Sequence, residues 1–197
     1  TVIIMANLAG KSGAALAPVV SSICKEQNKN VLSFAIMPFK FEKNKIFQSG
    51  ISLKRLRMNS DSTIIIDNDA ILDSNPDFTA EKCYDVTNNA IKCLTTSIRS
   101  SSLTDDTNIM STSRSTENIE DSVKDSIKML YEDAPPNSIK RSMLYVYGAE
   151  KIPVGVINSI SNILGGIFDQ ENSQVDMSTS GNTNVVLLSA IAGETRF

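Results

Sequence analysis

The sequence contains no histidine among its 197 residues and only three cysteines, Cys24, Cys83 and Cys93. Without histidine, the chain cannot build a Ser-His-Asp or Cys-His catalytic site, or a histidine-bound metal centre, from its own residues. The odd number and wide spacing of the cysteines predict reduced thiols rather than a disulfide framework or a zinc knuckle. Catalysis by this chain would therefore depend on carboxylates, backbone amides, amines, hydroxyls or a bound ion.

Long apolar runs and strongly basic stretches are also missing. No apolar segment approaches the roughly 20 residues that cross a bilayer, and no basic region precedes an apolar run as it does in a signal peptide. The formal net charge is −3, which argues against a nucleic-acid partner. We therefore expect a cytoplasmic protein that inserts into no membrane. Because the chain begins with Thr1 rather than Met, we also expect that it is a fragment or a processed product.

The first half of the chain predicts a parallel α/β sheet. Uninterrupted apolar runs predict buried strands at Val2–Met5, Val31–Met37 and Ser62–Asn68. Apolar residues at helical spacing predict a helix over residues 14–27, and Pro18 fits that helix only if it lies in the first turn. Repeated strand–helix–strand steps are typical of a partial Rossmann-like sheet flanked by helices, so the fold class is α/β.

The composition changes near the middle of the chain. A long helical pattern extends from Thr79 to about Ile98, and the Ser-, Thr-, Asn- and Arg-rich stretch that follows is typical of a linker. The rest predicts a smaller α+β domain with a mixed sheet. Its expected elements are a helix from Ile119 to Pro135, a strand over 142–148, a helix over 154–168, a weakly alternating segment over 173–180 and a last strand over 184–193. The predicted organisation is residues 1–78 for the part with the parallel sheet, 79–100 for a central helix, 101–118 for the linker and 119–197 for the smaller domain.

The stretch NLAGKSGAALAPVV, residues 7–20, places a Gly-Lys-Ser triplet directly after the first strand. A Walker-type loop needs a glycine five positions before Gly10, where this chain has Met5, so that architecture is excluded. Gly10 and Gly13 do not form the Gly-x-Gly-x-x-Gly pattern of dinucleotide sites either. A strand-to-helix junction still suits phosphate binding, because main-chain N–H groups and the helix dipole favour an anion there.

This stretch resembles the tubulin/FtsZ signature loop, GGGTGTGAAPVV. Residues 9–15 lie at the seven signature positions, where Gly10 and Gly13 keep glycine and Ser12 replaces a threonine, and residues 17–20 read APVV in both. Further resemblances follow in the family's order along nearly the whole chain. They are MPFKFEKNK, the segment 49–72 with its paired Asn68-Asp69, CYDVTNNAIKCL and VYGAEKIPVGVINSISNIL. The chain thus resembles a divergent FtsZ, similar to atypical archaeal members, without the N-terminal part of the nucleotide-binding domain.

The resemblance implies a site for guanine nucleotide and self-assembly. Family members bind GTP or GDP at the carboxyl ends of parallel strands, polymerise head to tail and hydrolyse GTP at the subunit junction. The implied cofactor is GTP or GDP, with Mg²⁺ as a further candidate, and the implied partner is another copy of the chain. The resemblance assigns phosphate contact to Gly10, Lys11, Ser12, Gly13 and Lys45, ribose contact to Glu42, base stacking to Tyr84 and recognition of the base edge to Asn88 and Asn89.

Hydrolysis is assigned to acids in the loop after the central helix, where this chain has only Asp105 and Asp106. The family's pattern around those acids is not reproduced. Three hypotheses follow: a GTP-binding, filament-forming protein of cell division with GTPase activity, a degenerate scaffold that assembles or binds partners without turnover, and an unrelated α/β enzyme fragment. The third predicts that the second half does not pack on the helix that begins near Thr79. Most candidate site residues also have an ordinary alternative: Gly10 and Gly13 as turn glycines, Glu42 and Lys45 as solvated loop charges, Tyr84 as a helix-capping aromatic, and Asp105 and Asp106 as polar linker residues.

Overall fold

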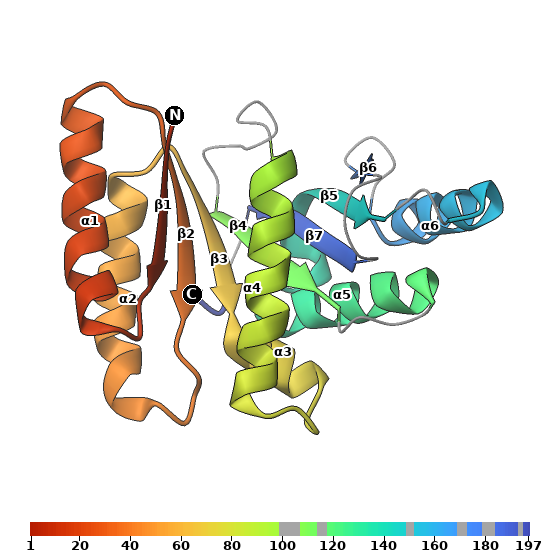
Figure 1. Ribbon diagram of the computed structural model, residues 1–197, viewed down its shortest axis with the longest axis horizontal. Coiled ribbons are helices and arrows are strands. Elements are labelled where there is room, and N and C mark those ends of the chain that lie inside the picture. The colour runs from red at the N-terminus through yellow and green to blue at the C-terminus, as the bar shows by residue number, and fades with distance from the viewer. Residues whose placement is uncertain (99–106, 114–117, 149–151, 169–172, 179–183, 193–194) are drawn as a thin grey trace.

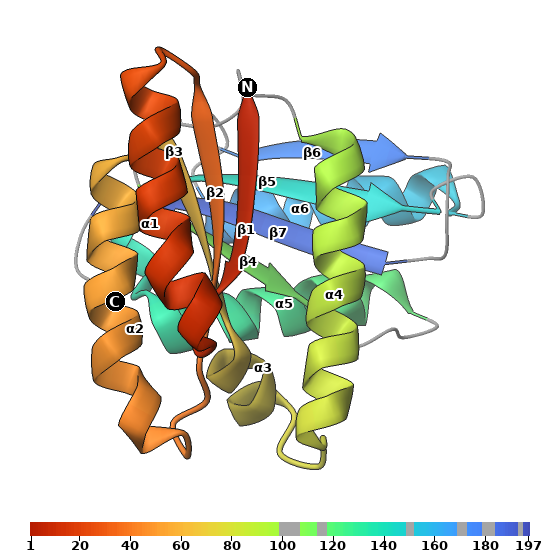
Figure 2. The ribbon, with the colours of Figure 1, turned by 60° about the vertical axis from the view of Figure 1, so that its left-hand side comes forward.

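Seven strands pair into one mixed sheet in the order β1-β2-β3-β4-β7-β5-β6 (Figure 1 and Figure 2). The structure is a computed structural model that describes residues 1–98, 107–113, 118–148, 152–168, 173–178, 184–192 and 195–197. Its elements are β1 (Val2–Asn7), α1 (Lys11–Glu26), β2 (Val31–Met37), α2 (Lys43–Met58), β3 (Ser62–Asp67), α3 (Asn68–Ser74), α4 (Ala80–Ser97), β4 (Thr107–Thr112), α5 (Ile119–Asp133), the 3-10 turn η2 (Pro136–Ser138), β5 (Ile139–Tyr147), α6 (Val154–Ile167), β6 (Ser173–Ser178) and β7 (Asn184–Ile191). The α/β class predicted from the sequence is confirmed.

The first four strands are parallel, and β7 is antiparallel to both β4 and β5. The three strands predicted from apolar runs are present as β1, β2 and β3. Helix α1 begins at Lys11, before the predicted start, so Pro18 is its eighth residue and lies inside the helix. The expectation that Pro18 occupies the first turn is therefore wrong. Pro18 is buried, which indicates that packing of α1 on the sheet offsets the missing N–H.

The sheet is covered on both faces, with α4 on one and α1, α2, α5 and α6 on the other (Figure 1). Alternation along β2 explains this division, since Phe34 faces α4 while Ala35 faces the α1–α2 layer. Helix α4 also packs on the second half of the chain: Leu94 shares a core cluster with Tyr145 and Leu188. This packing contradicts the hypothesis of an unrelated fragment whose second half does not reach α4.

Strand β4 corrects the predicted linker. Residues 107–112 lie inside the segment 101–118, yet they form a buried strand that pairs with β3 on one side and with β7 on the other. Residues 99–106 and 114–117 lie outside the described part of the chain. Because β4 joins the two halves of one sheet, the linker expectation is wrong for these six residues.

Strand β1 has one hydrogen-bonded neighbour, β2, among the strands described. Its side chains alternate: Ile3 and Met5 are 44% and 52% exposed, and their register partners Leu32 and Phe34 lie on the face that α4 covers. Helix α1 adds Leu16, Val19 and Ile23, each more than half exposed. We call these five exposed apolar residues the β1–α1 surface. No helix within the described ranges has the length and apolarity needed to span a membrane.

Candidate functional site

The carboxyl ends of the three parallel strands lie at one edge of the sheet, the lower edge in Figure 1. The register places Asn7 of β1 beside Ile36, and Met37 of β2 beside Asp67, so the strands end level with one another. The loops that follow them carry most of the residues assigned from the sequence. Open parallel sheets bind ligands at this edge, because loops and helix N-termini converge there.

The junction between β1 and α1 is tightly closed. Asn7 Oδ1 accepts a hydrogen bond from the Ala9 N–H at 2.9 Å, and the Asn7 carbonyl accepts one from the Gly10 N–H at 3.2 Å. A Cβ atom on Gly13 would lie 2.2 Å from the Asn7 carbonyl oxygen, so only glycine allows this approach of helix to strand. The requirement for glycine at position 13 is therefore steric.

The first turn of α1 is suited to an anion. Gly10 is the N-cap and supplies no side-chain cap, and the first turn contains no acidic residue. The N–H groups of such a turn lack intrahelical acceptors. Lys11 and Ser12 are exposed rather than packed against protein. The turn thus presents main-chain donors and one cation to solvent at the edge where the strands end.

The N-terminal end of α2 and helix α4 bring together Glu42, Lys45 and Tyr84. Glu42 Oε1 lies 2.6 Å from Lys45 Nζ, while Glu42 Oε2 accepts a hydrogen bond from the Phe39 N–H at 3.1 Å. The Tyr84 ring meets Phe39 edge to face with centroids 5.5 Å apart, and Phe41 stacks on Phe39 at 4.9 Å. An aromatic cluster therefore borders the charged pair.

Electrostatics couple these three side chains. The hydrogen bond from Lys45 to Glu42 and the attraction between their charges raise the pKa of Lys45. Partial burial, and then the nearby charge of Glu42, raise the pKa of Tyr84. At neutral pH the cluster therefore consists of an ion pair beside a neutral phenol.

The other assigned residues lie as follows. Asn88 and Asn89 are exposed on α4, one turn beyond Tyr84, so Asn88 shares the helical face of Tyr84. Asp105 and Asp106 lie outside the described residues. The structure thus places nine of the assigned residues at or near one edge, and the two candidate catalytic acids are not described.

Asn68 and Asp69 organise this edge, a role the sequence did not indicate. Asn68 Nδ2 donates to the Met37 carbonyl at 3.1 Å, and Thr87 Oγ1 donates to Asn68 Oδ1 at 3.1 Å, so Asn68 ties the end of β2 to α4. Asp69 Oδ2 accepts a hydrogen bond from the Lys40 N–H at 2.6 Å. The two side chains hold the loop that carries Glu42 against α4.

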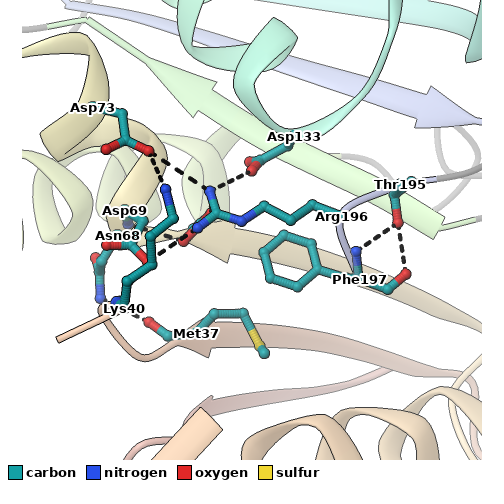
Figure 3. Close-up of polar contacts among 10 residues, drawn as sticks. Met37, Lys40, Asn68, Asp69, Asp73, Asp133, Thr195, Arg196 and Phe197 are labelled. Atoms are coloured by element: carbon teal, nitrogen blue, oxygen red, sulfur yellow. Dashed lines mark hydrogen bonds and ion pairs between the residues drawn. The ribbon is translucent and has the colours of Figure 1, made fainter. Parts of the chain in front are cut away.

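Arg196 lies among four carboxyl groups next to this edge, and Figure 3 labels three of them, Asp69, Asp73 and Asp133. Its Nη1 is 2.8 Å from Asp67 Oδ2 and 3.7 Å from Asp133 Oδ1, and its Nη2 is 3.1 Å from Asp69 Oδ2. Asp73 lies at 3.9 Å from Nη1 and also pairs with Lys40. Arg196 therefore connects β3 and α3 of the first half to α5 of the second.

Asp67 and Asp133 form a buried carboxyl pair behind Arg196. The Asp133 side chain is fully buried, and that burial, followed by the charge of Asp67, raises the pKa of Asp133 to about 9. Burial also raises the pKa of Asp67, against the opposing effect of the nearby Arg196 charge. The pair therefore holds one proton at neutral pH, with Arg196 balancing the remaining charge.

Comparison with known proteins identifies the first part of the chain. Residues 1–76 match the family model "Tubulin/FtsZ family, GTPase domain". Residues 1–76, about two fifths of the chain, are therefore similar to the GTPase domain of that family. The FtsZ match contains Gly10–Gly13, Glu42 and Lys45, whereas Tyr84, Asn88 and Asn89 lie beyond it.

Two archaeal relatives show the extent of the sequence similarity. "Cell division protein FtsZ 2" of Halobacterium salinarum is 35% identical over 85 residues, which is 43% of this chain and 22% of that protein. The protein of the same name from Methanocaldococcus jannaschii is 30% identical over 90 residues, 46% of this chain and 24% of that protein. The similarity thus spans about a quarter or less of these curated relatives.

Solved structures extend the likeness of the fold to the whole chain. The empty FtsZ dimer of M. jannaschii matches with a TM-score of 0.75 and 19% identity, over 97% of this chain and 63% of that one. CetZ from Methanosaeta thermophila matches with a TM-score of 0.63 and 16% identity, over 98% of this chain and 62% of that one. These matches show a shared FtsZ fold, of which the chain spans less than two thirds.

Proposed function

We propose that this protein binds guanine nucleotide at the edge formed by the ends of β1–β3 and the first half of α4, and that it self-assembles as an FtsZ-like protein of cell division. The observation that carries the proposal is the uncapped first turn of α1, held against β1 by Gly13, at the same edge as the Glu42–Lys45–Tyr84 group. A bound nucleotide needs donors for its phosphates and an aromatic surface for its base, and both are present.

Each group has a definite task in this proposal. The N–H groups of Lys11, Ser12 and Gly13 would donate to phosphate oxygens, and the exposed Lys11 ammonium would neutralise phosphate charge. The Tyr84 ring would stack on guanine. Asn88 and Asn89 would meet the base edge, where an amide can both donate and accept.

The chain's own contacts also support a second candidate, a scaffold that assembles without nucleotide turnover. Both carboxylate oxygens of Glu42 are already engaged, one by Lys45 and one by the Phe39 N–H. Contact with a ribose hydroxyl would have to use the second lone pair of an oxygen that already accepts a hydrogen bond. In this proposal, hydrolysis depends on Asp105 and Asp106. Mg²⁺ stays a prediction from the resemblance, since no group of three metal-binding side chains lies among the described residues.

A titration with fluorescent N-methylanthraniloyl-GDP, followed by polarisation, tests the proposal. We expect saturable binding that GTP reverses and ATP does not. Tyr84→Ala should weaken it about tenfold, because stacking on one base contributes roughly 1–3 kcal/mol. Tyr131→Ala, which removes an exposed tyrosine of α5, is the matched control and should leave binding unchanged.

The outcomes separate the two candidates. Equal binding by both tyrosine variants contradicts the placement of the base on α4. A folded protein that binds no guanine nucleotide yet sediments as a polymer supports the scaffold instead. GTP turnover that rises steeply with protein concentration, and that the double variant Asp105→Ala, Asp106→Ala abolishes, supports hydrolysis at a subunit junction.

A further inference from the structure

A cavity of about 1010 Å³ lies between α2 and the C-terminal segment, on the sheet face opposite α4. Its floor is formed by Thr63 and Asp67 of β3 and by Thr107 at the start of β4. None of the residues assigned to the nucleotide lines it. The volume is at the upper end of the range for pockets that hold small organic ligands, roughly 300–1,000 Å³.

The walls of this cavity, which we call the α2 cavity, are mainly apolar. Met37, Ile46, Leu53, Met58 and Phe197 contribute the apolar surface. Ile46 and Met58 are 44% and 75% exposed, so the apolar wall is accessible from solvent rather than sealed inside the core. An apolar ligand body would gain contact here without displacing core side chains.

The charges around the α2 cavity favour an anion. Its charged lining consists of Lys40, Lys54, Arg57, Arg196, Asp67 and Asp69, so cations outnumber carboxyl groups by four to two. The carboxyl groups are paired with Arg196, and Lys40 is paired with Asp73. Lys54 and Arg57 are exposed on successive turns of α2 and form no ion pair with any residue in the described ranges. The cavity therefore has two uncompensated cations on its α2 side.

From this arrangement we propose that the α2 cavity binds an amphipathic organic anion, with its apolar body against Leu53, Met58 and Phe197 and its anionic head at Lys54 and Arg57. The site is separate from the proposed nucleotide site, so occupation of one does not require the other. Charge complementarity selects the head group, and the volume admits a bicyclic or medium-chain body.

Gly50 makes the proposal testable. It lines the α2 cavity, and a Cβ built on it would have no heavy atom within 4 Å, so a large side chain there would enter open space. Gly155 in α6 is equally free of neighbours and lies outside the cavity. Gly50→Phe and Gly155→Phe are therefore a matched pair in which only the first fills the site.

The probe is 8-anilinonaphthalene-1-sulfonate, which combines a bicyclic apolar body with one sulfonate, titrated by fluorescence into the full chain. We expect one saturable site that decanoate competes for and decyltrimethylammonium does not. Gly50→Phe should abolish that site, and the charge-reversing pair Lys54→Glu, Arg57→Glu should weaken it about tenfold or more. Gly155→Phe and added GTP should leave it unchanged.

Several results would overturn the proposal. Equal binding by Gly50→Phe and Gly155→Phe places the probe elsewhere, for example on the β1–α1 surface. Equal competition by the cationic detergent removes the role of Lys54 and Arg57. Loss of the probe signal as protein concentration rises, together with dimers in sedimentation, identifies a second copy of the chain as the occupant. Loss of the signal on adding GTP assigns the probe to the nucleotide site, and this result leaves the proposed function standing.

Discussion

Replacement of Asp133 by asparagine should change how stability depends on pH. The pKa of Asp133 is raised to about 9 by burial and by Asp67, whereas an unfolded Asp titrates near 4. Between these values the native state holds a proton that the unfolded state has released. Because stability falls with pH wherever the native state binds more protons, Asp133 stabilises the fold most at low pH and progressively less towards pH 9.

The magnitude follows from proton linkage. While the native state holds one proton more than the unfolded state, each unit rise in pH lowers the free energy of unfolding by about 1.4 kcal/mol. An asparagine side chain at this position would keep the shape of the protonated carboxyl group without titrating. The Asp133→Asn variant should therefore gain stability relative to the wild type by up to about 3 kcal/mol between roughly pH 5.5 and pH 7.5. Coupling to Asp67 and Arg196 makes this an upper limit.

Urea unfolding followed by circular dichroism at several pH values measures this difference. Asp121→Asn removes an exposed carboxylate from the same helix, α5, and serves as the control. A flat difference for Asp133→Asn would refute the reasoning, because it would mean that Asp133 is ionised in the native state. A difference that shrinks as pH rises would contradict the sign of the linkage.

Four further substitutions, of which Gly50→Ala is a comparison for Gly13→Ala, test particular contacts by the same unfolding assay. Gly13→Ala should destabilise the fold by about 2 kcal/mol or more, because its Cβ would meet the Asn7 carbonyl oxygen at 2.2 Å. Gly50→Ala should instead stabilise the fold by up to about 1 kcal/mol. Equal effects of the two substitutions would contradict the steric explanation of the β1–α1 junction. Arg196→Met should lower the free energy of unfolding by about 3 kcal/mol near neutral pH, since it leaves a buried carboxylate without a partner, and by less in acid. No change in stability would mean that the buried carboxyl pair does not need Arg196. Pro18→Ala should stabilise α1 by about 1 kcal/mol, because alanine restores an N–H to the helix. This gain is partly offset, since the unfolded chain becomes more flexible without proline. Destabilisation would show that the proline ring itself is needed for packing.

Strands with uninterrupted apolar runs could be predicted from the sequence, and β4 shows where that signal ends. Its sequence TNIMST contains polar residues that look like a loop, yet Asn108 and Thr112 are buried. Asn108 Nδ2 donates to Ser62 Oγ at 3.0 Å, and Thr112 Oγ1 donates to the Val185 carbonyl at 2.7 Å. Because these partners lie far away in the sequence, no local sequence pattern indicates that the polar groups form hydrogen bonds inside the sheet.

Helix α2 was missed for a related reason. Two of its buried positions are serines, Ser49 and Ser52, so the apolar face is too weak to stand out. Ser49 Oγ donates to the Leu8 carbonyl at 2.7 Å, and this long-range contact makes the serine acceptable in the core. The strand ends and the Gly13 junction were accessible from local sequence. The group around Arg196 joins residues more than a hundred positions apart and became visible only in the fold.

Photolabelling with 8-azido-GTP tests the central claim, guanine-nucleotide binding at the carboxyl edge of the parallel strands, most directly. Trypsin cleaves after Lys82 and Lys92 and releases the peptide CYDVTNNAIK, which contains Tyr84, Asn88 and Asn89. We predict that this peptide carries the label and that excess GTP, but not ATP, prevents the labelling. A GTP-sensitive label found only on peptides from other parts of the fold, or no GTP-sensitive label on a folded protein, would contradict the account.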